Sequence, residues 1–281
     1  MIFEHEIPSY SHLYFGESAR RKREIEYTAS RLLADKGYEE ILTPLFSYHQ
    51  HQSIDEKSLI RFSDSQNHIV SLRADSTLDV VRIITRRLGR SVEKRKWFYI
   101  QPVFRFPSQE QYQIGAEWLS QSDLSGCIND SSEILSAIGL TPLLQISNIN
   151  IPKIVSDLLD LPLDVFKHGN LESLLDKSYP WLQKLTYLQR PAQIDEILDE
   201  VPERIEKELR KIKRLCEKID YPNLVIAPLY YAKMRYYDNL FFRYISGNQT
   251  IGMGGNYTYQ QIDSSGFALY TDNIIEEMMH S

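Results

Sequence analysis

Two groups of short β-prone runs, separated by a long helical stretch, constrain the fold of this chain more than any other feature of its sequence. Helices are expected over 17–36, where apolar residues recur at helical spacing before Gly37, and over 75–88. The β-prone runs are 38–44, 68–72, 97–105, 111–119, 223–228, 240–246, 250–255 and 266–270. Short strands of this kind, with helices around them, predict an α+β fold with a largely antiparallel sheet.

The middle of the chain, 151–220, has a different character and is predicted to be mostly helical. Its clearest element is a helix with one buried face and one charged face. The apolar residues of that buried face are Ile205, Leu209, Ile212, Leu215 and Ile219. We therefore expect a single domain over 1–281 in which 151–220 is a helical insertion.

Composition and charge narrow the class of protein. The 281 residues, 42% hydrophobic and 25% charged, are enough to bury a full core. No stretch approaches the roughly 18 consecutive apolar residues of a membrane span, and the N-terminus lacks the pattern of a secretion signal. We expect a cytoplasmic protein with no membrane contact. The net charge of −6 argues against a general nucleic-acid binder.

A few clusters of reactive or charged residues leave alternatives open. The basic segment 86–96 is either a solvated helix end or a local anion-attracting patch. His49 and His51 would share one face of a strand, but no cysteine or carboxylate cluster accompanies them. Cys127 and Cys216 lack metal-ligand spacing, which predicts reduced, structural thiols. We expect neither a metal site nor a bound cofactor.

The run 111–119 has one polar face, which Gln113, Gly115 and Glu117 share by alternation. The opposite face carries Tyr112, Ile114, Ala116 and Trp118. A face of this kind is either exposed to solvent or the hydrogen-bonding wall of a ligand site. Alternation alone favours the solvent-exposed interpretation.

Six segments, in order and at compatible spacing, resemble the catalytic core of histidyl-tRNA synthetases. They are 37–44, 72–77, 104–105, 113–117, 236–237 and 254–257. The resemblance spans nearly the whole chain and implies the class II aminoacyl-tRNA synthetase fold, an antiparallel sheet flanked by helices. It also implies a dimer formed through the segment that ends at Pro44, a residue that suits an edge strand or an interface.

The resemblance further implies a pocket for histidine. In the family, the positions of Asp75 and Thr77 supply a carboxylate and a hydroxyl to the α-amino group, and Asp75 stands where the family has glutamate. The position of Gln113 supplies an amide to the amino group, and that of Glu117 a carboxylate to the imidazole. Such a carboxylate would raise the pKa of the ligand ring.

Three more residues match the family's ligand-binding positions. Tyr237 and Tyr257 match tyrosines that wall the imidazole ring and hydrogen-bond to it. Arg105 matches the arginine that faces the ligand carboxylate and the α-phosphate of ATP. The histidine pocket implied by the resemblance therefore consists of Asp75, Thr77, Arg105, Gln113, Glu117, Tyr237 and Tyr257.

Other positions depart from the family where ATP is handled. Ala232 replaces the arginine that stabilises charge during adenylate formation, and loss of such a preorganised cation costs several kcal/mol of transition-state stabilisation. Pro107 stands where an acidic residue is usual, and 266–273 lacks the terminal arginine of its motif. We expect no catalytic residues, no anticodon-binding domain and no tRNA partner.

A histidine pocket without adenylation chemistry is similar to the regulatory subunits of ATP phosphoribosyltransferase. That resemblance implies a hetero-oligomer with the short-form catalytic subunit, in which the chain supports activity and confers feedback inhibition by histidine, the effector. The effector would bind in the inherited pocket or at a subunit interface.

Three alternatives remain. An active histidyl-tRNA synthetase is opposed by Ala232 and Pro107. A free-standing paralogue that modifies or senses another amino acid is motivated by Asp75 and by Asn256, which stands where the family has arginine. A scaffold with a vestigial pocket would bind nothing.

Overall fold

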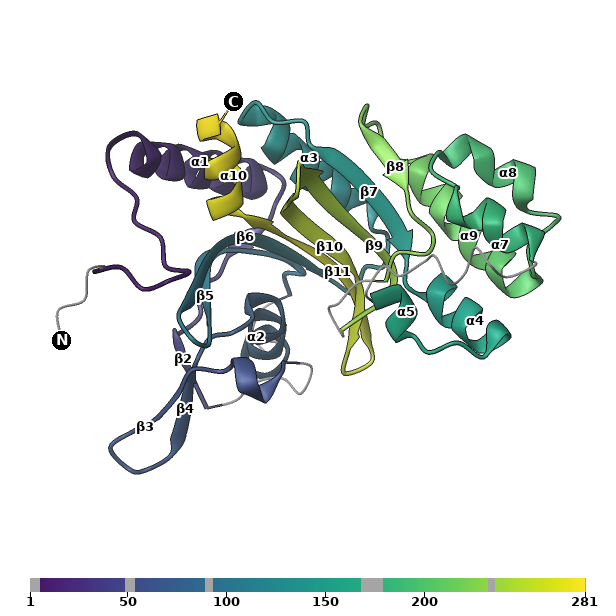
Figure 1. Cartoon of the computed structure of the whole chain (residues 1–281). Coiled ribbons are helices and arrows are strands. Elements are labelled where there is room, and N and C mark those ends of the chain that lie inside the picture. Colours follow the sequence, from purple (N-terminus) through teal and green to yellow (C-terminus); the bar gives the residue numbers. More distant parts are fainter. Residues whose placement is uncertain (1–5, 49–53, 89–92, 168–178, 232–235, 281) are drawn as a thin grey trace. The chain divides into compact units, whose positions relative to one another are not determined.

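A computed structural model of the chain describes residues 6–48, 54–88, 93–167, 179–231 and 236–280 (Figure 1). The chain forms two compact units. Unit 1 comprises Met1–Ser120, Ile134–Leu140 and Gly266–Ser281, and unit 2 comprises Gln121–Glu133 and Thr141–Ser265. The single domain expected over 1–281 stays a prediction.

The expected helices of unit 1 are confirmed. Helix α1 (Gly16–Asp35) buries Ile25, Ala29 and Leu33, as its spacing predicts. Helix α2 (Ser76–Ile83) begins after Asp75 and continues as a π-helical turn over Ile84–Leu88.

A third helix of unit 1, α10 (Thr271–His280), was not expected from the sequence. At its start, Asp272 accepts hydrogen bonds from the Tyr14 hydroxyl and, at 2.8 Å, from the Tyr112 amide. Burial raises the pKa of the Asp272 carboxyl. These bonds join the start of α10 to the N-terminal segment and to the sheet.

The main strands of unit 1 are β1 (Glu39–Glu40), β5 (Lys96–Arg105) and β6 (Gln109–Leu119), in that order. Strand β1 pairs in parallel with β5, and β5 pairs antiparallel with β6. Only two residues of the run 38–44 form a strand, and that strand lies at the edge of the sheet. A separate antiparallel sheet has the order β2 (Phe46–Ser47), β4 (Ile69–Leu72), β3 (Arg61–Ser63).

Unit 2 contains the strands β10 (Gln249–Tyr259), β9 (Tyr237–Ser246), β7 (Leu143–Asn148) and β8 (Leu224–Ile226), in that order. The β10–β9 and β9–β7 pairs are antiparallel, and β7 pairs in parallel with β8. Strand β11 (Ile262–Tyr270) begins in unit 2 and enters unit 1 at Gly266. Strand β7 was missed from the sequence, and the other three were expected.

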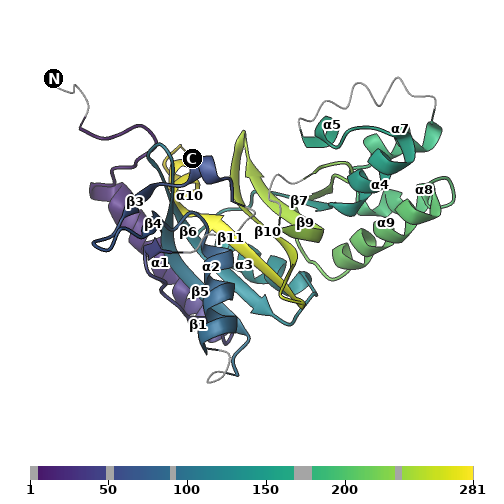
Figure 2. The ribbon, with the colours of Figure 1, turned by 90° about the horizontal axis from the view of Figure 1, so that it is seen from below.

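The described parts of the middle of the chain, 151–167 and 179–220, are mostly helical, and Figures 1 and 2 show their helices gathered together. Helix α9 is the long amphipathic helix, with Ile205, Leu209 and Ile212 all 0% exposed, and it ends before Ile219. Helix α3 (Ser125–Ala137), which was not predicted from the sequence, precedes this region. The helices of the region are α4 (Asn150–Leu159), α5 (Asp164–Lys167), α7 (Pro180–Thr186), α8 (Ile194–Ile197) and α9 (Glu203–Cys216), with a 3₁₀ turn over Pro191–Gln193.

The buried face of α9 predicts a large cost for truncation. Leu209→Ala should lower the free energy of unfolding by about 2–5 kcal/mol, because it removes a fully buried side chain and leaves a cavity. Urea denaturation followed by circular dichroism measures the change. The control Lys207→Ala, on the exposed face of the same helix, should cost about 1 kcal/mol or less, and equal losses would contradict the prediction.

Candidate functional site

The predicted site residues divide between the two units. Unit 1 holds Asp75 and Thr77 at the start of α2, Arg105 at the end of β5, and Gln113 and Glu117 on β6. Unit 2 holds Tyr237 on β9 and Tyr257 on β10.

The polar face of β6 is buried. Gln113 is 7% exposed and Glu117 is 0% exposed. The solvent-exposed interpretation that alternation favoured is therefore wrong, because residues on both faces of the centre of this strand are buried and the helices α2 and α10 pack against it. A carboxylate this deeply buried requires hydrogen-bonding partners.

The hydroxyl of Tyr99 links α2 to β6. It lies 3.1 Å from the hydroxyl oxygen of Thr77 and donates to Oε1 of Glu117 at 3.4 Å. With its proton directed to Glu117, the Tyr99 oxygen accepts from Thr77. Two of the predicted site residues thus belong to one hydrogen-bonded chain.

Tyr99 is not among the residues predicted from the sequence, although its strand partner gives a signal for it. Tyr99 on β5 lies opposite Gly115 on β6. A Cβ atom on Gly115 would lie 2.1 Å from the ring carbon Cζ of Tyr99, so the ring occupies the space that the glycine leaves. An aromatic residue opposite a glycine, on a strand pair with buried polar residues, is the pattern that identifies it.

Glycine is also required beside Glu117. A Cβ atom on Gly266, at the start of the unit 1 part of β11, would lie 2.0 Å from Oε2 of Glu117. Because the carboxylate packs against bare backbone, no larger residue fits at this position without displacing it. The backbone of β11 therefore helps to fix the position of the buried acid.

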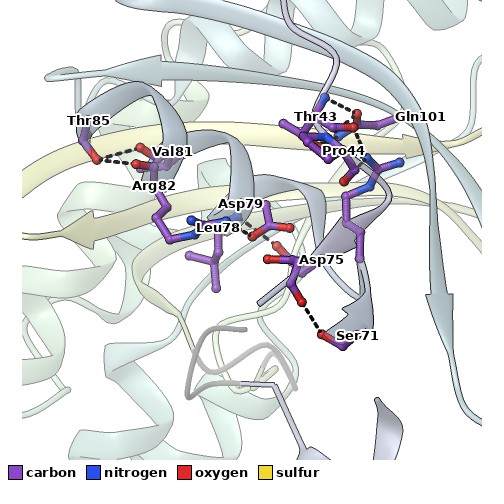
Figure 3. A network of polar contacts seen from close by, with 12 residues as sticks. Thr43, Pro44, Ser71, Asp75, Leu78, Asp79, Val81, Arg82, Thr85 and Gln101 are labelled. Carbon is purple, nitrogen blue, oxygen red and sulfur yellow. Dashed lines mark hydrogen bonds and ion pairs between the residues drawn. The ribbon is translucent and has the colours of Figure 1, made fainter. Parts of the chain in front are cut away.

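Asp75 has a structural task beside the role expected of it. Its Oδ1 accepts a hydrogen bond from the backbone N–H of Leu78 at 2.9 Å, which caps α2 (Figure 3). A negative charge here is also favoured by the helix dipole. Arg105 is held nearby, because its Nε donates to the carbonyl of Ala74 at 3.2 Å.

The turn that carries Asp75 is anchored by Arg73, which is 1% exposed. Its Nη1 donates to the carbonyl and hydroxyl oxygens of Thr43, at 2.8 and 2.9 Å. Its Nε and Nη2 donate to the carbonyl of Pro102, at 3.0 and 2.6 Å. The side chain of Gln101 completes the network through the amide and hydroxyl of Thr43 (Figure 3).

Unit 2 contributes an aromatic cluster. Tyr237 and Tyr257 lie directly opposite each other across β9 and β10, and both are buried. The ring of Tyr236 lies 4.6 Å from that of Tyr237 and 6.2 Å from that of Tyr257, measured between centroids. A Cβ on Gly255 would lie 2.7 Å from Cδ1 of Tyr237, so this cluster also depends on a glycine.

Three other residues considered in the sequence, Asn256, Gln113 and Lys96, contact neighbouring groups of the protein itself. The amide of Asn256 donates to the carbonyl of Ser122 at 2.8 Å within unit 2. Gln113 donates to the side chain of Gln111 at 3.2 Å. In the basic segment, Lys96 lies over the ring of Trp118 at 3.9 Å.

Several expectations concern residues outside the described ranges, namely His49, His51, Arg90 and Ala232. Cys127 is a buried thiol that donates to the hydroxyl of Ser265 at 3.4 Å, and burial raises the pKa of Cys216 to about 12. Within the described ranges, no helix combines the length and apolar character needed to cross a membrane.

Comparison with known proteins identifies the fold. A family model described as histidyl-tRNA synthetase matches residues 14–274. A crystal structure of an ATP phosphoribosyltransferase regulatory subunit/histidyl-tRNA synthetase from Bacillus halodurans is similar to this chain with a TM-score of 0.85 and 19% identity, covering 98% of this chain and 83% of that one. The predicted class II synthetase-like α+β fold is confirmed.

Two relatives are similar in sequence over nearly their full length. The ATP phosphoribosyltransferase regulatory subunit of Wolinella succinogenes is 45% identical over 280 residues, covering 99% of this chain and 98% of the relative. The protein of the same name from Helicobacter hepaticus is 38% identical over 277 residues, covering 98% and 99%.

The buried acid of unit 1 leads to a test of ligand binding. L-Histidine should raise the melting temperature, and at about 100 times its dissociation constant it should add about 2.7 kcal/mol of apparent stability. Glu117→Gln keeps the volume but removes the charge, and should blunt the shift, as should Tyr237→Phe. The control Lys211→Ala, on the charged face of α9, should leave it unchanged, and equal shifts in all variants would place the ligand elsewhere.

Proposed function

The chain belongs to the histidyl-tRNA synthetase family and to the family of ATP phosphoribosyltransferase regulatory subunits, and from this membership we propose that it regulates an ATP phosphoribosyltransferase catalytic subunit. The observation that carries the proposal is the 45% identity with the regulatory subunit of W. succinogenes over 98% of that protein. The similarity therefore extends over the whole of a regulatory subunit and not only over a shared catalytic core.

The proposed role is non-catalytic. Ala232 and Pro107 stand where the synthetase family has residues that handle ATP, and 266–273 lacks the arginine of its motif. Gly266, the first residue of that segment, lies against the carboxylate of Glu117. The segment therefore contributes to the shape of the amino-acid pocket. Adenylation needs preorganised cations around the phosphates, and these substitutions argue against it.

The proposed effector is histidine, bound in the inherited pocket. The chain of hydroxyls from Thr77 through Tyr99 to Glu117 supports this proposal, because it holds a buried carboxylate in place. A carboxylate is a strong acceptor for an imidazole N–H, especially where water is excluded. Binding that differs between two states of an assembly by about 1–3 kcal/mol would change activity roughly 5- to 150-fold.

We further propose that the chain dimerises through the segment that ends at Pro44. Leu42 and Leu45 lie on either side of Pro44 and are 71% and 44% exposed, and exposed apolar side chains gathered in one segment favour an interaction site. The dimer would join short-form catalytic subunits in a hetero-oligomer that contains no tRNA, and we propose that this assembly works in the cytoplasm.

The regulatory role predicts an assembly that responds to histidine. Mixing the chain with a short-form ATP phosphoribosyltransferase should give a complex with higher turnover than the catalytic subunit alone, and histidine should inhibit it. Light scattering measures the mass, and product formation from ATP and phosphoribosyl pyrophosphate measures activity. Glu117→Gln should assemble normally and lose the inhibition. A catalytic subunit that works equally well alone, with no complex at micromolar concentrations, would contradict the role.

The non-catalytic role predicts that the isolated chain makes no histidyl-adenylate. Histidine-dependent exchange of pyrophosphate into ATP should stay at the level of a buffer control, while a working histidyl-tRNA synthetase under the same conditions gives a signal. Exchange above the buffer control would show that the chain is an active synthetase.

A further inference from the structure

The side chain of Arg73 connects the start of the predicted histidine pocket to an exposed apolar stretch of unit 1. We define the ligand turn as residues 73–78 and the apolar segment as residues 42–48. We propose that Arg73 is a positioning residue that couples the two, so that a ligand held at the turn changes the conformational freedom of the apolar segment. The proposal rests on the function proposed above and specifies how the pocket communicates with the rest of the subunit.

The guanidinium of Arg73 is bonded to two separate stretches of backbone. Its Nη1 donates to Thr43, which belongs to the apolar segment, and its Nε and Nη2 donate to Pro102, on β5. Nη1 also lies 3.4 Å from the carbonyl oxygen of Pro44. Burial lowers the pKa of Arg73, and the charge of Asp79 opposes this effect. These acceptors are carbonyls and a hydroxyl, so they hold the cation through the positions of the backbone.

The backbone of Arg73 makes the same connections. Its N–H donates to the carbonyl of Leu45 at 2.8 Å, and its carbonyl accepts from the N–H of Phe104 at 2.8 Å. The next carbonyl, that of Ala74, accepts from Arg105. The ligand turn is therefore bonded on one side to the apolar segment and on the other to β5.

Movement of one segment without the other is costly. If the apolar segment shifts away from the turn, a charged donor at 1% exposure loses its acceptors where water does not replace them. The turn and the apolar segment are also joined by the backbone bond from Arg73 to Leu45 and by the pairing of β2 with β4, in which Phe46 and Ser47 face Leu72 and Ser71. A ladder of two residue pairs contributes little on its own. The bonds made by Arg73 are thus the stronger connection.

The ligand turn holds two of the residues that would contact histidine, and the apolar segment holds residues in contact with solvent. Asp75 and Thr77 lie in the turn, two and four residues beyond Arg73. In the apolar segment the exposed side chains are Leu42, Leu45, Phe46 and Tyr48, at 71%, 44%, 59% and 63%. A ligand that holds the turn in one geometry therefore also restricts this exposed segment.

Hydrogen exchange of the full-length chain tests the coupling. In the wild type, saturating L-histidine should slow exchange of the amides of Leu45–Tyr48 by about fivefold or more, the lower end of an allosteric effect. Arg73→Lys keeps the charge but loses the planar fork that reaches Thr43 and Pro102 together, and should abolish the slowing. Thr43→Val removes only the hydroxyl acceptor and should reduce it. The matched control is Arg82→Lys, on α2, whose partner is Asp79 at 2.9 Å; it should respond like the wild type.

The outcomes separate this proposal from the function on which it rests. Slowing of the same size in wild type, Thr43→Val and Arg73→Lys overturns the coupling, and if Arg73→Lys does not fold, Thr43→Val alone decides. If histidine leaves the melting temperature of the wild type unchanged, the pocket assignment fails. The coupling through Arg73 is then tested without ligand. Thr43→Val should speed exchange of the Leu78 amide by about fivefold relative to the wild type, and an unchanged rate overturns the coupling.

Discussion

A guanidinium that is 1% exposed must find an acceptor for its donors inside the protein, and in unit 1 this requirement brings separate stretches of backbone together around Arg73. Thr43 comes from the end of the segment after β1, and Pro102 from the centre of β5. Helix α2 then starts at Ser76, shortly after Arg73 in the chain, with its position already fixed. The position of α2 also sets the start of the hydrogen-bonded chain from Thr77 through Tyr99 to Glu117, because Thr77 lies in the first turn of that helix.

Elements with a strong local pattern were predictable from the sequence. Helix α9 has an uninterrupted apolar stripe, and β5 and β6 form a long hairpin with turn residues between them, so each was found within a few residues of its ends. Strand β7 was missed although Leu144 and Ile146 alternate with Gln145 and Ser147, because so short an alternation is a weak signal. Helix α10 was missed because it is only ten residues long and follows β11 directly, and bonds from distant residues to Asp272 fix its start.

The site shows a similar division. The resemblance to a family selected Glu117 and Thr77, and the structure joins them through Tyr99, which no family motif had indicated. Alternation predicted correctly that Gln113 and Glu117 share a face, but it does not reveal what covers that face, which depends on elements distant in sequence. The sequence shows only that Asp75 is shorter than the family's glutamate. The structure shows that it caps α2. The roles of Tyr237 and Tyr257 toward a ligand stay predictions.

The division of the chain between the two units has a consequence for the order of events during synthesis. Apart from Ile134–Leu140, unit 1 takes its residues from the two ends of the sequence, whereas the residues of unit 2 all lie between Gln121 and Ser265. A ribosome therefore completes unit 2 before it supplies Gly266 and α10, so the first unit to begin is the last to finish. Until then, Gly266, whose backbone packs against Glu117, and Asp272, which accepts from Tyr14, have not been synthesised. The earlier strands of unit 1 therefore lack these contacts until the last part of the chain is made.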